Sequence, residues 1–276
     1  MYTGIYHTNV TLHFYKSNSV ASNPKISSRL GVAGFQRRDQ TPADLIIPLC
    51  DEGNRGFWFM IENPEETDSK RIQIPSYTRR IVLELREVPF PVIFTGGINP
   101  LFWEPVVAIG AFILSSYDMD LTPSLGLLLD GKSHEFSLGV NDGISYWLVD
   151  ANLHLWLDHR SSNVEAGSGR YDSPSRHMVG QEKLEEQLDG TFKVEAEVHS
   201  EFDGWVKSSE GNLTTVVKSM FKVGNLVKFE QNGSYKRVEQ SVKTKRVVEV
   251  TFESGEPVKR VVQQRTYSLT VITSTR

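Results

Sequence analysis

The sequence predicts an all-β protein: a jelly-roll-like antiparallel β-sandwich, then a second antiparallel β domain. Three observations predict this class. Apolar and polar residues alternate from Trp147 to Asp158, with the period of two that is typical of a strand. Turn signals such as Asp130-Gly131 separate alternating runs. The alternation returns after Thr191, beyond a stretch rich in Ser, Gly, Arg and Glu. We expect a sandwich over 1–158, a linker over 159–190 and a second domain over 191–276.

The composition indicates a globular protein and excludes some partners. The chain has 276 residues, 39% hydrophobic and 23% charged, with a formal net charge of −4. An acidic balance gives no electrostatic reason to expect a nucleic-acid partner. The longest apolar run, from Pro105 to Leu114, is about half of the roughly 20 residues that a membrane-spanning helix needs. We therefore expect neither nucleic acid nor a membrane span.

Residues 1–90 are predicted to contain short strands among polar loops. Alternation predicts strands at 10–15 and 57–61. A short buried strand is expected in the apolar run that ends at Leu49. The segment 17–40, rich in Ser, Asn, Gly and Arg, is expected to be loop.

The central stretch 91–158 is predicted to be a series of strands separated by turns. Gly96-Gly97 and Asn99-Pro100 interrupt the chain. Strands are predicted at 117–121 and, after Asp130-Gly131, through Phe136, Leu138 and Val140. From 147 to 158 the odd-numbered residues form an apolar face, while the even-numbered ones form a more polar face.

The last third is expected to be an antiparallel meander with one face in water. Within 159–190 we expect one helical turn, at Glu182 to Leu188. From Phe192 to Val198 alternate residues are apolar, and from Lys193 to His199 the intervening residues are polar. Turn clusters at 231–234 and 253–257 then separate further strands.

Several familiar catalytic and metal-binding motifs are absent from the sequence. There is no G-x-S-x-G elbow for a serine nucleophile, and His134-Glu135 has no second His four residues after the first. Cys50 is the sole cysteine, so we expect a small buried hydrophobe, without a cation or helix N-terminus to activate it. No cofactor and no metal site are predicted.

The central stretch also resembles a known family. The segments PVIFTGGINPLFWEP, SSYDMDLTP, LLDGKSHEF and VDANLHLWLD occur in this order, and they are similar to the plant and fungal peptide-N-glycosidase A family. The resemblance implies hydrolysis of the amide bond between an N-glycan and asparagine, giving aspartate and a glycosylamine. It implies glycosylated peptides or proteins as partners and a secreted or vacuolar location. The alternative function, which is not enzymatic, is that of a non-catalytic glycan-binding or structural β-sandwich.

The resemblance also implies segments that this chain lacks. The segment from Ile72 to Leu85 looks like one strand of the family. In family members an insert follows that strand, with a His, acidic residues and a Phe-Trp-Tyr cluster, before the strand that starts at Pro91. Here Val88 leads directly to Pro89. The family further implies an N-terminal signal and additional C-terminal strands, so we expect both domains to be incomplete. We therefore expect the chain as given to release little or no glycan.

Carboxylates beside aromatic residues are the candidate catalytic groups. Amide hydrolysis needs a base that activates water and a proton donor, and paired acids can supply both. Asp118 and Asp120 share one face of a predicted strand, with Cβ atoms about 7 Å apart. The alternative is that both acids simply face solvent.

Further candidates are expected to bind the glycan. Tryptophan rings stack on the apolar faces of sugars, which makes Trp103, Trp147 and Trp156 candidate substrate-binding residues. Asp150 and His154 share the polar face of the 147–158 strand with Trp156. Alternatively, this is merely the outer face of a sandwich sheet.

Three Asn-x-Ser/Thr sequons begin at Asn9, Asn212 and Asn232. The first residues contain no basic segment followed by an apolar one, so no signal peptide is predicted within the chain. If the protein enters the secretory pathway, we expect these asparagines on exposed loops or strand edges.

Overall fold

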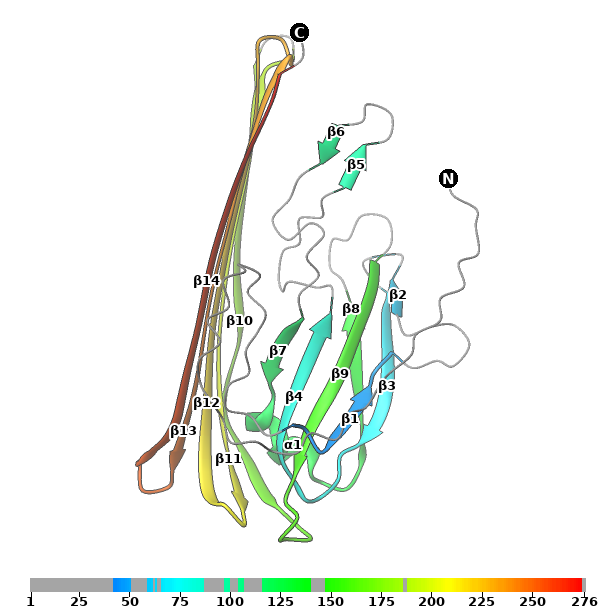
Figure 1. Ribbon diagram of the computed structural model, residues 1–276, viewed down its shortest axis with the longest axis vertical. Helices are drawn as coiled ribbons and strands as arrows, with labels where there is room; N and C mark the ends of the chain where they lie inside the picture. Colours follow the sequence, from blue (N-terminus) through cyan, green and yellow to red (C-terminus); the bar gives the residue numbers. More distant parts are fainter. Residues whose placement is uncertain are drawn as a thin grey trace, which may run out of the picture. The chain divides into compact units, whose positions relative to one another are not determined.

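The computed structural model describes residues 42–50, 59–61, 63, 66–86, 97–99, 104–106, 116–139, 147–185 and 188–274 (Figure 1). Over these residues antiparallel strands dominate. The helices that they contain are η2 (Thr122–Ser124) and α1 (Leu125–Leu128). The all-β prediction is confirmed. None of the helices in this part of the chain is long and apolar enough to cross a membrane.

The first sheet is built around the strand that the alternation marks most clearly. Its order is β1 (Leu45–Pro48), β9 (Trp147–Leu157), β4 (Thr78–Arg86) and β7 (Tyr117–Asp120), and β2 (Phe59–Ile61) also pairs with β9. All of these pairings are antiparallel. Both edge strands, β1 and β7, have four residues, and short edges limit pairing with other chains.

The hydrophobic core lies on the odd-numbered face of β9, as the alternation predicts. Ala151, Leu153 and Leu155 are fully buried there. The antiparallel pair β3 (Thr67–Gln73) and β8 (Ser133–Gly139) packs against this core through Ile72, Phe136 and Leu138. In β8 intermediate and exposed residues alternate along the whole strand. Gly131, at φ +78°, forms the predicted turn before β8.

Five long strands form a second sheet (Figure 1). They follow one another in chain order as β10 (Glu165–Leu184), β11 (Gly190–Ser208), β12 (Gly211–Glu230), β13 (Tyr235–Phe252) and β14 (Pro257–Ser274). Each has 18 to 20 residues, a length of roughly 60–65 Å. The predicted meander and its turns at 231–234 and 253–257 are confirmed. A separate hairpin pairs β5 (Gly97–Asn99) with β6 (Glu104–Val106).

The short helices pack directly on the long sheet. Pro123 is in the first turn of η2, where its missing N–H costs no hydrogen bond. A Cβ atom on Gly204 of β11 would lie 2.2 Å from the Pro123 carbonyl oxygen. Glycine at this position lets the two backbones approach each other.

Three expectations about secondary structure were wrong. The predicted linker with a helical turn contains β10, because continuous pairing with β11 outweighs the weak strand propensity of its Ser and Gly residues. The strand expected from Ile72 to Leu85 is two strands, since the chain turns after Pro75. The strand β1 was expected to be buried, yet Leu45 and Ile46 are 37% and 53% exposed at the sheet edge. The expected strand at 10–15 and loop at 17–40 lie outside the described residues.

Candidate active site

One face of the first sheet carries the polar residues that the sequence singles out. Directly opposite residues of neighbouring strands point to the same side of a sheet. The register aligns Asp118 of β7 with Glu84 of β4 and Asn152 of β9, and Asp120 with Val82 and His154. Arg80 is likewise opposite Trp156. We call this surface the polar face; its residues are Arg80, Val82, Glu84, Asp118, Asp120, Asp150, Asn152, His154 and Trp156.

A buried histidine and glutamate form the first pair on the polar face. The His154 Nε2 atom is 2.9 Å from Oε2 of Glu84. His154 is 7% and Glu84 9% exposed. A charge-assisted hydrogen bond offsets the cost of removing both groups from water. The pair can hold a proton at a fixed place between β4 and β9.

A second pair fixes Asp120. Arg80 donates from Nη2 to Oδ2 of Asp120 over 3.2 Å, and the Thr122 backbone N–H donates to Oδ1 over 3.1 Å. The same guanidinium lies 4.4 Å from the ring centre of Trp156, which is 3% exposed. Asp120 is 7% exposed, so it does not face solvent freely.

Two acidic residues of the polar face lie directly opposite each other on neighbouring strands. Glu84 and Asp118 are directly opposite across β4 and β7, and like charges in this position are destabilising. Arg246 of β13 supplies a balancing charge. Desolvation lowers the pKa of its guanidinium, whereas the nearby Asp120 and Asp118 carboxylates act to raise it. A neighbouring contact comes from β14, where Arg265 lies 5.9 Å from the ring centre of Tyr117.

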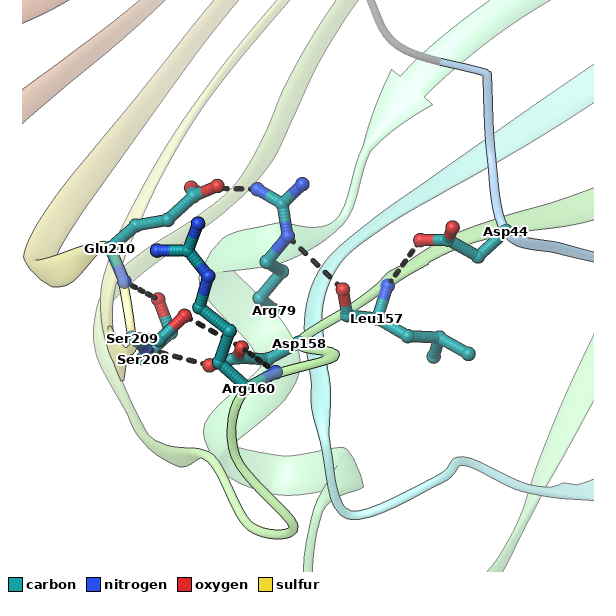
Figure 2. A network of polar contacts seen from close by, with 8 residues as sticks. All are labelled: Asp44, Arg79, Leu157, Asp158, Arg160, Ser208, Ser209 and Glu210. Atoms are coloured by element: carbon teal, nitrogen blue, oxygen red, sulfur yellow. Dashed lines mark hydrogen bonds and ion pairs between the residues drawn. The ribbon is translucent and has the colours of Figure 1, made fainter.

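Asp158, at the end of the alternating run, joins the two sheets (Figure 2). Its carboxylate accepts hydrogen bonds from the Ser209 backbone N–H at 2.6 Å and from the Ser209 hydroxyl at 2.7 Å. These bonds lower its pKa to about 2. Beside it, Arg79 binds Glu210 at 2.7 Å and the Leu157 carbonyl at 3.3 Å. The network holds the end of β9 to the turn between β11 and β12.

The structure thus brings together most of the candidate residues that it describes. Asp118, Asp120, Asp150, His154 and Trp156 all belong to the polar face. Trp147 begins β9, and Trp103 lies outside the described residues. The burial of Trp156 differs from the exposed ring expected of a sugar platform.

Sequence reasoning missed three partners of these residues. Glu84 and Arg80 lie on the same face of β4. The signal for this was their alternation with the apolar residues of the other face, Ile81, Leu83 and Leu85. Arg246 carries no such signal. It is brought near the acids by a strand more than a hundred residues later in the chain.

The two described sequons differ in accessibility. Asn232 is exposed in the turn between β12 and β13, with φ +58°. Asn212 is the second residue of β12, is half-buried, and donates from Nδ2 to Oε2 of Glu253 at 3.1 Å. Its Oδ1 atom is buried without a hydrogen-bond partner. Asn9 lies outside the described residues.

Cys50 is buried, as predicted, and is 1% exposed. Its thiol lies 3.4 Å from the Val149 carbonyl oxygen. Burial raises the pKa of the thiol to about 11, which disfavours the nucleophilic thiolate. In the part of the chain that the structure describes, no three His, Cys, Asp or Glu side chains gather into a potential metal site.

Comparison with known proteins agrees with the resemblance in sequence. Residues 86–174 match the family described as peptide N-acetyl-beta-D-glucosaminyl asparaginase amidase A. The chain is 34% identical over 290 residues to the peptide-N4-(N-acetyl-beta-glucosaminyl)asparagine amidase A of Prunus dulcis, a match that covers 87% of the chain. The chain spans about half the length of that relative, since the match covers 50% of it. No solved structure matches the chain.

Proposed function

We propose that this chain, whose residues 86–174 belong to the peptide N-acetyl-beta-D-glucosaminyl asparaginase amidase A family, contributes the site that hydrolyses the glycan–asparagine amide. One observation carries the proposal. The matched segment includes β7 and β9, and these strands supply Asp118, Asp120, Asp150 and His154 to one sheet face. The products are an aspartate in the peptide and a glycosylamine.

The polar face offers groups for both halves of this reaction. Water must lose a proton as it attacks the amide carbonyl, and the leaving nitrogen must gain one. Asp118 is the proposed base, beside the Asp120 carboxylate that Arg80 and Thr122 hold in place. The buried His154–Glu84 pair is the proposed proton donor, because its hydrogen bond keeps one shared proton at a defined position.

The proposed substrate-binding residues are the candidate tryptophans together with Asp150 and His154. Trp156 lies beneath the Arg80 guanidinium, so its ring would contact a sugar only after Arg80 moves. Trp103 and Trp147 remain the proposed stacking platforms. Substrates are N-glycosylated peptides or proteins, and the proposed compartment is the secretory pathway or vacuole.

We propose that a family segment is absent between Val88 and Pro89 and that its absence lowers the activity. The alignment with the relative is 290 residues long, whereas it covers 87% of this 276-residue chain. The relative therefore carries residues that have no counterpart here. We propose that the family's insert supplies further acids and aromatic residues, and that the chain alone is a weak catalyst.

The proposal is tested by incubating an N-glycosylated peptide with the 276-residue chain and with a form carrying the family's insert after Val88. Mass spectrometry would follow conversion of the glycosylated asparagine to aspartate. We expect conversion by the insert-bearing form and little or none by the chain alone. Losing one essential acid or base typically costs about two to four orders of magnitude in rate.

Two results would change this assignment. Glycopeptide binding without release by the insert-bearing form, measured by calorimetry, would favour the non-catalytic glycan-binding alternative. Rapid release by the unmodified chain would place all of the chemistry within residues 1–276 and remove the proposed role of the insert.

A further inference from the structure

Trp205 of β11 is an exposed aromatic residue in the middle of the second sheet's surface. Of the tryptophans whose side chains the structure describes, Trp156 is 3% exposed and Trp205 is 39% exposed. A single exposed hydrophobic side chain is ordinary. The residues around Trp205 therefore decide whether its exposure has a function.

The Trp205 indole lies directly against the backbone of the neighbouring strand. Gly167 of β10 is opposite Trp205 in the register, and a Cβ atom on Gly167 would overlap with Nε1 of the indole. Any side chain at position 167 would therefore displace the ring. A glycine within a strand weakens that strand, and it often marks a place of close approach. Here it allows the indole to rest in one defined place at the surface.

Trp205 points to the face of the long sheet that is directed away from η2. Adjacent residues of a strand point to opposite faces. Both neighbours of Trp205 point inwards, because Gly204 lies against η2 and Val206 belongs to the hydrophobic core. Trp205 therefore belongs to the outer face of this sheet.

Polar side chains surround Trp205 on this outer face. Asp203 and Lys207 are two residues before and after it on β11, each about 7 Å away along the strand. Thr214 of β12 is directly opposite Trp205. Residues two apart on one strand, or opposite on the next, share a face. We call Asp203, Trp205, Lys207 and Thr214 the Trp205 patch.

The two charged groups of the patch are held by β10 and keep capacity for a ligand. Oδ1 of Asp203 accepts a hydrogen bond from the Arg170 backbone N–H at 3.3 Å. Gly169 leaves room for this carboxylate, since a Cβ atom there would overlap with Oδ2. The Lys207 ammonium is 3.2 Å from Glu165. A carboxylate has about four acceptor sites and an ammonium has three donors, so each group has further hydrogen bonds to offer.

This arrangement fits a neutral sugar ring. The apolar C–H face of a sugar can stack on the indole. Its hydroxyls can donate to Asp203 and accept from Lys207, and they can do both with Thr214. One acid and one base give the patch no net charge, which favours a neutral ligand. A protein partner would need about 800 Å² of surface with an apolar centre, whereas the neighbours of Trp205 are charged or hydroxyl-bearing.

We propose that the Trp205 patch is a carbohydrate-binding site, at which one sugar ring of a glycan stacks on the indole between Asp203 and Lys207. No residue of the polar face takes part, so the inference is independent of the proposed hydrolysis. The site holds a glycan without reacting with it.

Nuclear magnetic resonance of the tryptophan indole N–H groups tests the site directly. The protein is produced in a bacterial host, because Asn212 is opposite Lys207 on the same face and a glycan of its own would reach the patch. The Trp205 signal is the one that is lost in Trp205→Phe. We expect chitobiose, a disaccharide without an asparagine amide, to shift this signal saturably. Sorbitol, an open-chain polyol without a sugar ring, should not shift it.

Point variants separate the ring from the polar groups beside it. Asp203→Ala and Lys207→Met should each raise the dissociation constant for chitobiose about three- to tenfold, because each removes a hydrogen bond to the sugar. In Trp205→Ala the backbone amide signal of Thr214 should no longer shift with chitobiose. Tyr267→Ala is the matched control, since Tyr267 is 43% exposed on β14 and lies outside the patch. It should leave the dissociation constant unchanged.

Three results would overturn the proposal. They are a Trp205 signal that chitobiose does not shift at any concentration up to its solubility, an equal shift with sorbitol, or an unchanged dissociation constant in both Asp203→Ala and Lys207→Met. Glycan release by the insert-bearing form together with any of these results would refute the carbohydrate-binding site alone and leave the proposed hydrolysis standing.

Discussion

At the scale of single residues, the Asp158 carboxylate makes a pH-dependent contribution to stability. Its pKa is about 2 in the folded protein, below its ordinary value of 3.8. The folded state therefore binds this proton less readily than the unfolded chain, so the contribution is present above about pH 4 and is lost as pH falls towards 2. We expect Asp158→Asn to reduce the free energy of unfolding at pH 7 by about 1–3 kcal/mol, measured by urea denaturation.

The same variant should also flatten the pH dependence between about pH 5 and 2. Asp172→Asn is the control, because Asp172 also has a lowered pKa, caused by Arg170, but lies exposed on the surface. It should leave the free energy of unfolding nearly unchanged. Equal effects of the two substitutions would show that the link between Asp158 and Ser209 does not stabilise the fold.

The two sequons give a second prediction at this scale. A glycan is attached at Nδ2 of asparagine. Asn232 is exposed in its turn, whereas Nδ2 of Asn212 donates a hydrogen bond to Glu253. Expression in a secretory host should give high glycan occupancy at Asn232 and low occupancy at Asn212, measured by peptide mass spectrometry. The reverse order would show that folded accessibility does not control modification here.

At the scale of elements, Gly204 controls how η2 packs on β11. The Cβ atom of Gly204→Ala would meet the backbone of Pro123 at 2.2 Å from its oxygen. We expect overpacking to lower the free energy of unfolding by about 1–3 kcal/mol. Gly180→Ala in β10 is the matched control, because its Cβ would meet nothing within 4 Å. Equal free energies of unfolding for the two alanine variants in urea denaturation would show that Gly204 does not control this packing.

The elements predicted from sequence are those with a clear local signal. The odd-numbered core face of β9 and the turns at Asp130-Gly131 and Asn232-Gly233 follow from period and turn chemistry. Strand β10 does not, since its Ser, Gly and Pro residues form a strand only through pairing with β11. The expected helical turn at 182–188 was wrong for the same reason, and the helices observed are at 122–128.

At the scale of the whole molecule, the candidate site depends on contacts between distant segments. Alternation alone sets Asp150, His154 and Trp156 on one face of one strand. The pairing of His154 with Glu84 joins residues 70 positions apart, and it depends on strand order and register. No local pattern contains that pairing. Alternation in β4 could place Glu84 and Arg80 on one face of their strand, but it could not show that they lie beside His154 and Asp120 or that Arg246 lies near them.

The most direct measurement of the central claim is the rate of glycan release by point variants of the insert-bearing chain. If the polar face performs the hydrolysis, Asp118→Asn and His154→Gln should each lower kcat/KM at least tenfold, about 1.4 kcal/mol in the barrier. Asp172→Asn, an exposed carboxylate on β10, should leave kcat/KM unchanged. Urea denaturation of each variant would separate lost chemistry from lost folding. Full activity in both polar-face variants, with their folds intact, would contradict the account and move the chemistry away from this sheet.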